Sequence, residues 1–469
     1  MSFVSFRFWA ILPLVFILYW LIPSKHVRVR NLYLLGLGLF FYMLWKPVFA
    51  LILLYIIVAT FFLSICSNRL NDRRLYQWGG VLLTLLPLLF FKYFNFIGES
   101  IASVLSFVGI FFPFTGLNWA VPIGISFYSF QAVGYFLDVC NNRIHPEKNF
   151  LDYALFISFF PQVVSGPISK GQELLPQIKQ EHLFDYEQVY SGLRQLTWGL
   201  FLKLVIADRL GMCVNNIIYG YSIYSGFTLF CGTVFYSLQI YCDFAGYSFM
   251  AIGAAKLFGF DLINNFRQPY FSVSVTDFWR RWHISLSRWL KDYVYIPLGG
   301  SRCSKVRNYW NILVTFFVSG LWHGANWTFV IWGLLHGVVQ VLEKFLGLQK
   351  SNSKGLLRVI RIAVTFIVVN FIWVFFRMPS LEMVGKYFTH MFTTPGFFDI
   401  DAVGLTAMLV LTISLSILIL RDVNAETEGK LMGRIIKNRW CSIAILAVLI
   451  ALVLSVGVLD SSTFIYANF

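Results

Sequence analysis

Long apolar segments separated by short basic loops recur along this chain of 469 residues, and they restrict its fold more than any other feature. Hydrophobic residues make up 58% of the sequence and charged residues 13%, about half the charged share of an ordinary soluble domain. A helix that crosses a bilayer needs roughly 20 predominantly apolar residues. The sequence therefore predicts an all-α integral membrane protein, and it excludes a soluble enzyme and a disordered chain.

Thirteen apolar segments are candidates for membrane spans, and we expect about ten to twelve of them to cross. The first is preceded only by Arg7 and lacks a small-residue cleavage site, which favours a retained span over a signal peptide. Segment 151–188 mixes apolar stretches with prolines and polar residues, so we expect it to be re-entrant or interfacial. The candidates lie near residues 8–23, 32–45, 48–65, 78–97, 101–115, 119–138, 191–207, 226–242, 309–325, 326–342, 357–377, 402–420 and 440–458.

Basic residues gather in four short loops, and they account for much of the net charge of +15. The positive-inside rule places these loops in the cytoplasm and both termini on the outer face. No basic stripe with soluble flanks suggests a nucleic-acid surface, and seven scattered cysteines indicate neither disulfides nor a metal site. Without an internal repeat, residues 1–469 are expected to form a single polytopic domain. The loop residues are Lys25, Arg28 and Arg30; Arg69, Arg73 and Arg74; Lys344, Lys350, Lys354, Arg358 and Arg361; and Arg421, Lys430, Arg434, Lys437 and Arg439.

Residues 267–300 are too charged to span a membrane and too aromatic for an ordinary loop. From Thr276 onward, apolar residues at three- and four-residue steps predict one amphipathic helix. Composition alone favours a merely interfacial helix, but His283 at the border of the apolar face is not needed for anchoring. The apolar face holds Trp279, Trp282, Leu286, Trp289, Leu290 and Tyr293, and the opposite face holds Arg281, Arg288 and Asp292, of which the last two are spaced to pair.

A second unusual stretch, residues 319–337, carries His323, Asn326 and His336 within or between apolar segments. Ionisable groups at membrane depth are costly, and they usually face an interior cavity. The alternative is that these histidines hydrogen-bond neighbouring helices, and this alternative stays open for His336. For His323, which follows Trp322 in a polar break, a functional role is favoured.

Asp243 is a further acid at the edge of an apolar segment, and we expect it to pair with a base of residues 267–300. The remaining histidines lie in loops and are expected at the solvated surface: His26, His145, His182 and His390.

These residues favour acyl transfer from a thioester. The sequence contains no nucleophile elbow, P-loop, dinucleotide fingerprint or metal motif. A neutral imidazole can take the proton of an acceptor hydroxyl as it attacks a thioester, while a second histidine hydrogen-bonds the carbonyl or the first histidine. A thiolate leaves readily, so no metal or permanently bound cofactor is expected. The basic side chains near residues 267–291 suit the phosphates of a donor such as coenzyme A.

Two other classes of protein remain possible from the residues alone. A polysaccharide or ion transporter would need ionisable groups along a path, whereas here they gather in two segments. A scaffold of an export complex should tolerate the loss of His323.

Long sequence blocks resemble the membrane-bound O-acyltransferase (MBOAT) family, and within it the branch of the alginate O-acetylation membrane proteins. The resemblance covers residues 92–347 and includes a C-terminal FIYANF at 464–469. The blocks are KYFNF (92–96), VPIGISFYSFQAVGYFLDV (121–139), FFPQVVSGPI (159–168), GLFLKLVIADRL (199–210), YCDFAGYSFMAIGAAKLFGF (241–260), FWRRWHISLSRWLKDYVYIPLGGSR (278–302) and GLWHGANWTFVIWGLLHG (320–337).

The resemblance implies a helical fold around a central tunnel. It also implies that His323, in the family's WHG motif, is the main catalytic residue and that His283, in the WHISLS block, is the second. The family often has an acid after GYS, where this chain has Phe249. The candidates for supporting or tunnel-lining roles are Trp322, Asn326, Arg281, Asp292 and Asp243.

Proteins similar to this one take an acyl group from a cytoplasmic thioester and present it outside a bacterial inner membrane. The expected acceptor is an exported polysaccharide, reached through an SGNH-type periplasmic or extracellular acetyltransferase. The YIPLGG after WLKDY resembles the acetylating members more than the teichoic-acid D-alanylation members, and this resemblance favours acetyl-CoA as the donor. D-alanyl or other acyl transfer from a carrier-protein thioester is the alternative. The identity of the polysaccharide, and whether the acceptor is the glycan or a partner serine, stay open.

Overall fold

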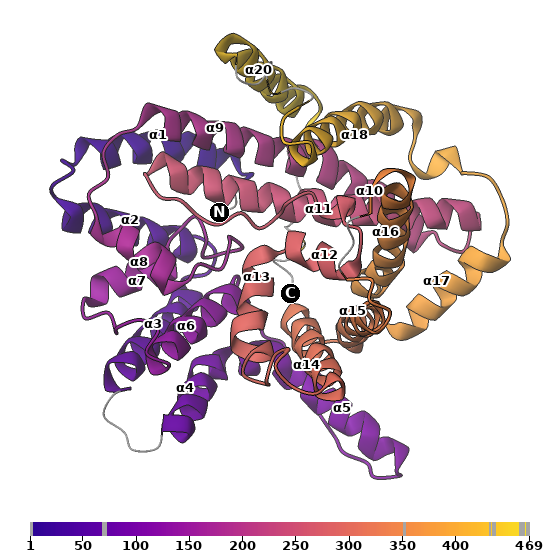
Figure 1. Cartoon of the computed structure of the whole chain (residues 1–469), viewed down its shortest axis with the longest axis horizontal. Helices are drawn as coiled ribbons and strands as arrows, with labels where there is room; N and C mark the ends of the chain where they lie inside the picture. The colour runs from indigo at the N-terminus through magenta and orange to yellow at the C-terminus, as the bar shows by residue number, and fades with distance from the viewer. Residues whose placement is uncertain are drawn as a thin grey trace. The chain divides into compact units, whose positions relative to one another are not determined.

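A computed structural model describes residues 3–67, 73–349, 353–430, 433, 438–458 and 465. These residues form helices joined by turns and loops, and none of them lies in a β-strand (Figure 1). The all-α prediction is confirmed for this part of the chain. Four of the loop cations used to predict orientation, Arg69, Lys350, Arg434 and Lys437, lie outside the described residues, as does most of FIYANF at 464–469.

The chain divides into two compact units. The first comprises Met1–Gly192, Ala251–Ile263 and Tyr466–Phe469, and the second comprises Leu193–Met250 and Asn264–Ile465. The helices of the first unit are α1 (Phe6–Leu21), α2 (Val27–Met43), α3 (Pro47–Cys66), α4 (Arg73–Leu88), η1 (Leu89–Tyr93), α5 (Phe94–Phe107), α6 (Ile125–Cys140), α7 (Phe150–Ser158), α8 (Gly171–Lys179) and the first part of α9 (Tyr186–Leu200).

The second unit holds the remaining helices. They are the end of α9, η2 (Phe201–Ala207), α10 (Asp208–Tyr219), most of α11 (Gly226–Leu257), η3 (Pro269–Phe271), α12 (Val275–Arg281), α13 (Ile284–Leu290), η4 (Lys291–Tyr295), α14 (Lys305–His323), α15 (Trp327–Phe345), α16 (Gly355–Arg377), α17 (Leu381–Thr393), η5 (Ile400–Ala402), α18 (Leu405–Glu426) and α20 (Arg439–Val456).

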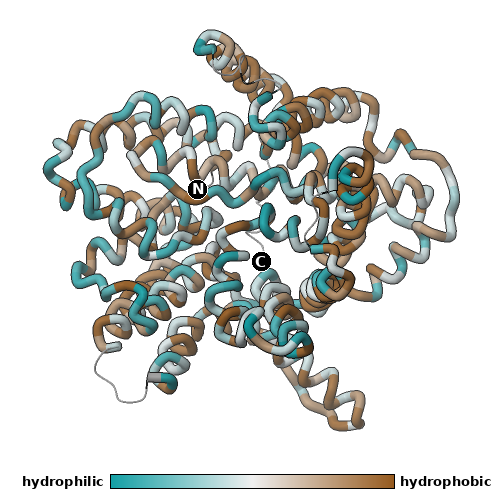
Figure 2. The backbone as a smooth tube through the Cα atoms, in the orientation of Figure 1, coloured by the Kyte–Doolittle hydropathy of each residue, from teal (hydrophilic) through white to brown (hydrophobic). Residues whose placement is uncertain are grey.

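Six described helical segments are long and apolar enough to cross a membrane, and the tube in Figure 2 is predominantly hydrophobic along α16, α18 and α20. A multi-pass membrane protein is therefore confirmed. The apolar helix α1 is shorter than these segments, and the total of about ten to twelve spans stays a prediction. The six segments are Pro47–Cys66, Arg74–Phe107, Trp327–Phe345, Gly355–Arg377, Leu405–Glu426 and Arg439–Val456.

The prediction of a separate span near 101–115 is wrong. Helices α4 and α5 are continuous through the π-helical turn η1, and residues 108–122 after α5 are not helical. Pro87 ends the regular hydrogen bonding of α4, because proline has no N–H and its ring clashes with the preceding turn. A π-turn follows it, and both features bend helices. Accordingly, α4 and α5 leave their junction in different directions (Figure 1).

Segment 151–188 does not form a spanning helix, as expected. Helices α7 and α8 have nine residues each, and the turn between them is buried. Gln162 in this turn donates to the backbone oxygen of Phe156 at 3.1 Å and to Gln131 at 3.2 Å. Gly124, with φ of +72°, faces the backbone of Val163 so closely that a Cβ could not fit. Protein atoms therefore satisfy and cover this irregular backbone.

In the second unit, α14 and α15 form a hairpin whose backbones approach closely. Gly320 faces the carbonyl of Phe329, and Gly333 faces the carbonyl of Phe316, with no room for a Cβ at either glycine. Small residues of this kind let membrane helices pack at short distance. The hairpin brings the C-terminal end of α14, with His323, against the first turns of α15.

Candidate active site

The two histidines that the sequence singled out lie together in the second unit. The ring centroids of His283 and His323 are 6.4 Å apart, and the two side chains are 0% and 1% exposed. His283 precedes α13, and His323 ends α14. Trp322, a predicted supporting residue, packs at 5.6 Å from the ring of His283.

The expected single helix over residues 276–293 is wrong, although its apolar face is buried as predicted except at Tyr293, which is half-buried. The chain breaks between α12 and α13, where His283 adopts a left-handed backbone with φ of +44°. This conformation is strained for a residue with a Cβ, and neighbouring contacts must hold it. Asn265 does so, because its carbonyl accepts the N–H of Ile284 and its side-chain oxygen accepts the N–H of Ser285 at 3.1 Å. The break places His283 outside both helices, so it does not belong to the helical face that periodicity assigned.

His283 lies outside the six candidate spans, and burial lowers the pKa of its imidazole to about 3. The ring is therefore neutral between pH 5 and 8. Phe244 packs edge-on against it, with centroids 4.7 Å apart. A neutral imidazole can donate one hydrogen bond and accept another, as a proton-transfer site requires.

Aromatic side chains surround His323. The ring centroid of Trp332 lies 4.8 Å from that of His323, and the ring of Phe376 lies 5.4 Å away. Both aromatic residues are almost fully buried. An enclosure of this kind excludes bulk water, which strengthens polar interactions inside it and protects a reactive ester from hydrolysis.

Replacing His283 with asparagine is expected to reduce acyl transfer by about 10- to 100-fold while the protein accumulates normally. Asparagine tolerates the left-handed backbone, so the exchange removes the imidazole with little added strain. Turnover per mole of folded protein, measured beside the protein level, checks this result. If the protein level fell by the same factor as the total activity, His283 would have a structural role only.

His336, whose role stayed open, lies on α15 and is 0% exposed. Its ring packs against Trp332 at 5.0 Å and Trp279 at 5.3 Å. Neither ring nitrogen has a hydrogen-bond partner among the described residues. The alternative that His336 hydrogen-bonds two helices together is therefore wrong for this part of the chain.

A pocket of about 460 Å³ opens beside this aromatic cluster. Four cationic side chains line it, Arg280, Arg288, Lys291 and Lys344, and no lining residue is acidic. Trp279 and Phe316, which both pack on His336, form part of its wall. The charge of the pocket suits a ligand with several phosphate groups.

Lys344 and Gln340 line the pocket, but sequence reasoning assigned neither to a site and used Lys344 only to predict membrane orientation. A signal was present, because His336, Gln340 and Lys344 follow one another at four-residue steps and so share one face of a helix. Asn265 was also missed, since a single asparagine in a loop carries no pattern.

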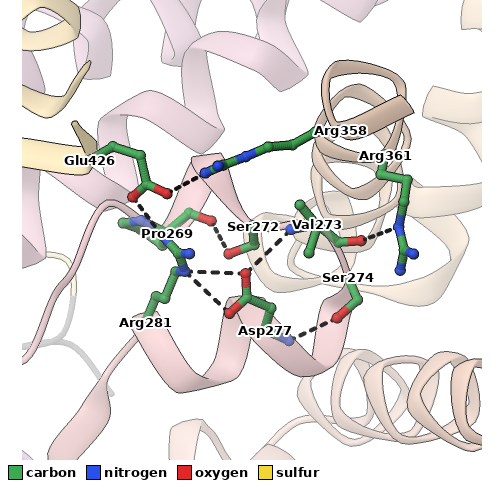
Figure 3. Close-up of polar contacts among 9 residues, drawn as sticks. All are labelled: Pro269, Ser272, Val273, Ser274, Asp277, Arg281, Arg358, Arg361 and Glu426. Carbon is green, nitrogen blue, oxygen red and sulfur yellow. Dashed lines mark hydrogen bonds and ion pairs between the residues drawn. The ribbon is translucent and has the colours of Figure 1, made fainter. Parts of the chain in front are cut away.

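Arg281 takes part in an ion-pair network rather than lining the pocket (Figure 3). It contacts Asp277 on its own helix at 3.2 Å and Glu426 of α18 at 2.7 Å, and Arg358 of α16 contacts the other oxygen of Glu426 at 2.6 Å. Arg361 adds a bond from its side chain to the backbone oxygen of Val273. These contacts tie α12 to α16 and α18, and they hold the segment that leads to His283.

The expected partner of Asp243 is wrong. Its carboxylate pairs with Lys203 at 2.6 Å, and Lys203 also contacts Asp208 at 2.7 Å. All three side chains are nearly inaccessible. The pairing follows from the contact of α11 with η2, and it fixes the helix that carries Phe244 against His283.

Other predicted residues have local roles. Asn326 caps α15 by accepting the N–H of Thr328 at 2.9 Å, and it donates to the carbonyl of Pro379. Asp292 lies half-buried in η4. The ring of Phe249, where the family often has an acid, packs 5.0 Å from the guanidinium of Arg421.

Two of the remaining histidines are exposed as expected, but His182 is buried, so its surface assignment is wrong. Its ring packs 4.4 Å from that of Phe260, and Nε2 lies 2.8 Å from the carbonyl of Gln177. His390 is half-buried and bonds the carbonyl of Tyr224.

Comparisons with known proteins agree with the chemistry of this arrangement. The model of the membrane-bound O-acyltransferase family matches residues 140–385. A probable alginate O-acetylase from Azotobacter vinelandii is 34% identical over 416 residues, which are 87% of this chain and 82% of that protein. A peptidoglycan O-acetyltransferase from Helicobacter pylori is 34% identical over 80% of this chain and 77% of its own length. A teichoic acid D-alanyltransferase from Bacillus subtilis is 27% identical over 56% of this chain and 70% of its own length.

Proposed function

The chain belongs to the membrane-bound O-acyltransferase family, and from this premise we propose that it moves an acetyl group from cytoplasmic acetyl-CoA across the bacterial inner membrane for O-acetylation of an exported polysaccharide. The observation that carries the proposal is the buried pair of His283 and His323 in the same unit as a pocket with four cations and no acid. The histidine pair suits proton transfer, and the cationic pocket suits the phosphates of coenzyme A.

In the proposed step, a ring nitrogen of His323 accepts the proton of the acceptor hydroxyl. The hydroxyl oxygen forms a bond to the thioester carbonyl carbon, and the carbon–sulfur bond breaks. The thiolate of coenzyme A leaves and takes the proton back, so His323 returns to its neutral form. His283, neutral and 6.4 Å from His323 between ring centroids, orients His323 or donates a hydrogen bond to the carbonyl oxygen.

The acceptor lies on the outer side in this proposal. The cations of the pocket include Lys344, in the last turn of α15, at the end of the helix that the positive-inside rule assigns to the cytoplasm. The same rule puts both termini outside. The names of the relatives support a polysaccharide acceptor, with alginate and peptidoglycan as two examples. Transfer to it passes through an SGNH-type periplasmic or extracellular acetyltransferase.

The second candidate is D-alanyl transfer from a carrier-protein thioester, which the Bacillus subtilis relative supports. The pocket favours acetyl-CoA. Coenzyme A carries a diphosphate and a further phosphate, whereas a carrier protein presents its thiol through a single phosphodiester. Four cations without an acid match the more highly charged donor.

Neutralising Arg288 and Lys291 together, as Arg288→Gln with Lys291→Gln, is expected to raise KM for acetyl-CoA at least about 10-fold with kcat little changed, because both side chains line the pocket. The initial rate of coenzyme A release over a range of acetyl-CoA concentrations checks this. Arg307→Gln, at an exposed cation outside the pocket lining, is the matched control and should leave KM unchanged. An equal change in both variants would contradict a donor site here.

The proposal is tested with purified protein in lipid vesicles and acetyl-labelled coenzyme A. Release of free coenzyme A is measured for the wild type and for His323→Ala, with and without a candidate SGNH-type protein. Turnover that depends on His323, with label in the glycan or in the SGNH-type protein, is the expected result. Turnover with carrier-protein thioesters but not with acetyl-CoA would reject acetyl-CoA as the donor and support the second candidate function. Absence of turnover with every thioester would overturn the proposal.

A further inference from the structure

His336 is a fully buried imidazole with both ring nitrogens unbonded among the described residues. Burial of a polar group without a hydrogen bond is unfavourable, and native proteins rarely keep one without a ligand or water to bond it. The indole N–H groups of Trp279 and Trp332, which both pack on this ring, likewise have no partner in the described part of the chain. Several hydrogen-bonding groups therefore lie in one cluster of rings without bonding one another.

This place lies between the cationic pocket and His323. On one side, Trp279 and Phe316 contact His336 and also line the pocket. On the other side, Trp332 contacts both His336, at 5.0 Å, and His323, at 4.8 Å. The rings thus form a continuous contact from the pocket to the site of acyl transfer.

Helix α15 gives the length of this path. Lys344 lies in the pocket wall, and His336 and Trp332 precede it by two and three turns along the same helix. At about 1.5 Å per residue, Lys344 and Trp332 are about 18 Å apart along the axis, with His336 between them. A thioester that is held by its phosphates in the pocket can reach His323 only if a long arm separates the phosphates from the sulfur.

The pantetheine arm of coenzyme A is such a chain, and it carries two amide groups. An amide offers one N–H donor and one carbonyl acceptor, which are the complements of the two nitrogens of a neutral imidazole. The apolar rings around His336 suit the methylene and methyl groups of the same arm. A phosphate would suit this place poorly, because the side chains whose rings pack on His336 are uncharged phenylalanines and tryptophans.

We propose that His336 is a donor-binding residue that hydrogen-bonds an amide of the pantetheine arm as the arm passes along the contacting rings of Trp279 and Trp332 toward His323. This assignment rests on the proposed function and adds to it a third functional histidine, one that acts on the donor's arm and not on its phosphates or its acyl group. It explains why an imidazole occupies an aromatic cluster in which it bonds no described protein group.

The test uses the full-length protein and the variant His336→Phe, which keeps an aromatic ring and removes both nitrogens. The donors are acetyl-CoA and ethyl thioacetate, which has neither arm nor phosphates. The kcat/KM for acetyl-CoA is expected to fall at least about 10-fold, mainly through KM, while that for ethyl thioacetate stays the same. His336→Gln, which keeps a donor and an acceptor, should recover part of the loss.

The matched control is His182→Phe, at the buried histidine that does have a backbone partner. It should lower the melting temperature without changing KM for acetyl-CoA. Equal losses for both donors in His336→Phe, or a lower melting temperature with unchanged KM, would overturn the assignment and make His336 a packing residue.

A binding measurement tests this inference independently of the proposed reaction. Coenzyme A and 3′-phosphoadenosine 5′-diphosphate carry the same three phosphate groups, but only coenzyme A has the arm. Coenzyme A should raise the melting temperature of the wild type more than the diphosphate does, and His336→Phe should abolish that difference. If the wild type fails to turn over acetyl-CoA, the proposed function is wrong, and this comparison still decides whether His336 binds the arm. A difference that persists in His336→Phe would refute the inference.

Discussion

Replacing His323 with alanine is expected to abolish acyl transfer, while the protein still inserts in the membrane and accumulates. A general base contributes about 100- to 10,000-fold to a rate, and the other imidazole that packs on Trp332, that of His336, lies on a different helix, α15. The substitution removes an aromatic-sized side chain at the end of a helix, whose backbone hydrogen bonds remain. Labelled acetyl transfer per mole of membrane-inserted protein measures the effect.

His323→Gln separates the loss of the imidazole from the loss of volume, because glutamine fills more of the buried space than alanine. Both variants should be inactive, and the exposed His145→Gln should match the wild type. Retained transfer in either His323 variant would exclude His323 as the base and revive the transporter or scaffold hypotheses.

Replacing Lys203 with methionine is expected to prevent accumulation of folded protein. Lys203 is the common partner of Asp208 and Asp243, and its side chain is 1% exposed. Removing one member of a buried ion-pair network leaves uncompensated charge in a medium that solvates it poorly, which costs about 3–5 kcal/mol. That loss is comparable to the whole free energy of unfolding of many proteins. Yield after mild detergent extraction and the melting temperature of the extracted protein measure it.

The charge explanation predicts a rescue. Lys203→Met combined with Asp208→Asn and Asp243→Asn removes all three charges together and should restore much of the yield. Lys386→Met breaks the exposed ion pair with Glu382 and is the matched control, with little expected change. A triple variant as poor as Lys203→Met would show that packing, and not charge, makes Lys203 necessary.

Local sequence patterns predicted the helical class and the buried face of the aromatic segment. An apolar run of about 20 residues predicts a membrane helix because the bilayer thickness sets its length, wherever the run later packs. The three- and four-residue steps that include Trp279, Trp282 and Leu286 predicted one buried face, and these residues are buried. The same periodicity missed the break at His283, because Asn265, from a separate loop, holds that strained backbone.

Distant contacts decided the rest of the candidate site. The sequence showed that Asp243 needed a partner, but only the packing of α11 against η2 selected Lys203 over a base of residues 267–300. Likewise, His182 lies in a polar loop and is nevertheless buried.

By itself, the sequence determined that the chain is helical, that it enters a membrane, and that His283 and His323 are candidates for one chemistry. Only the tertiary structure decided that these two rings meet and that Lys344 and Arg288 line one pocket. It also decided that His336, on the helix that joins the pocket to the histidine pair, bonds no described protein group. The physical reason is range. Hydrophobic length and periodicity act along a single helix, whereas a site depends on which helices pack together and at what register.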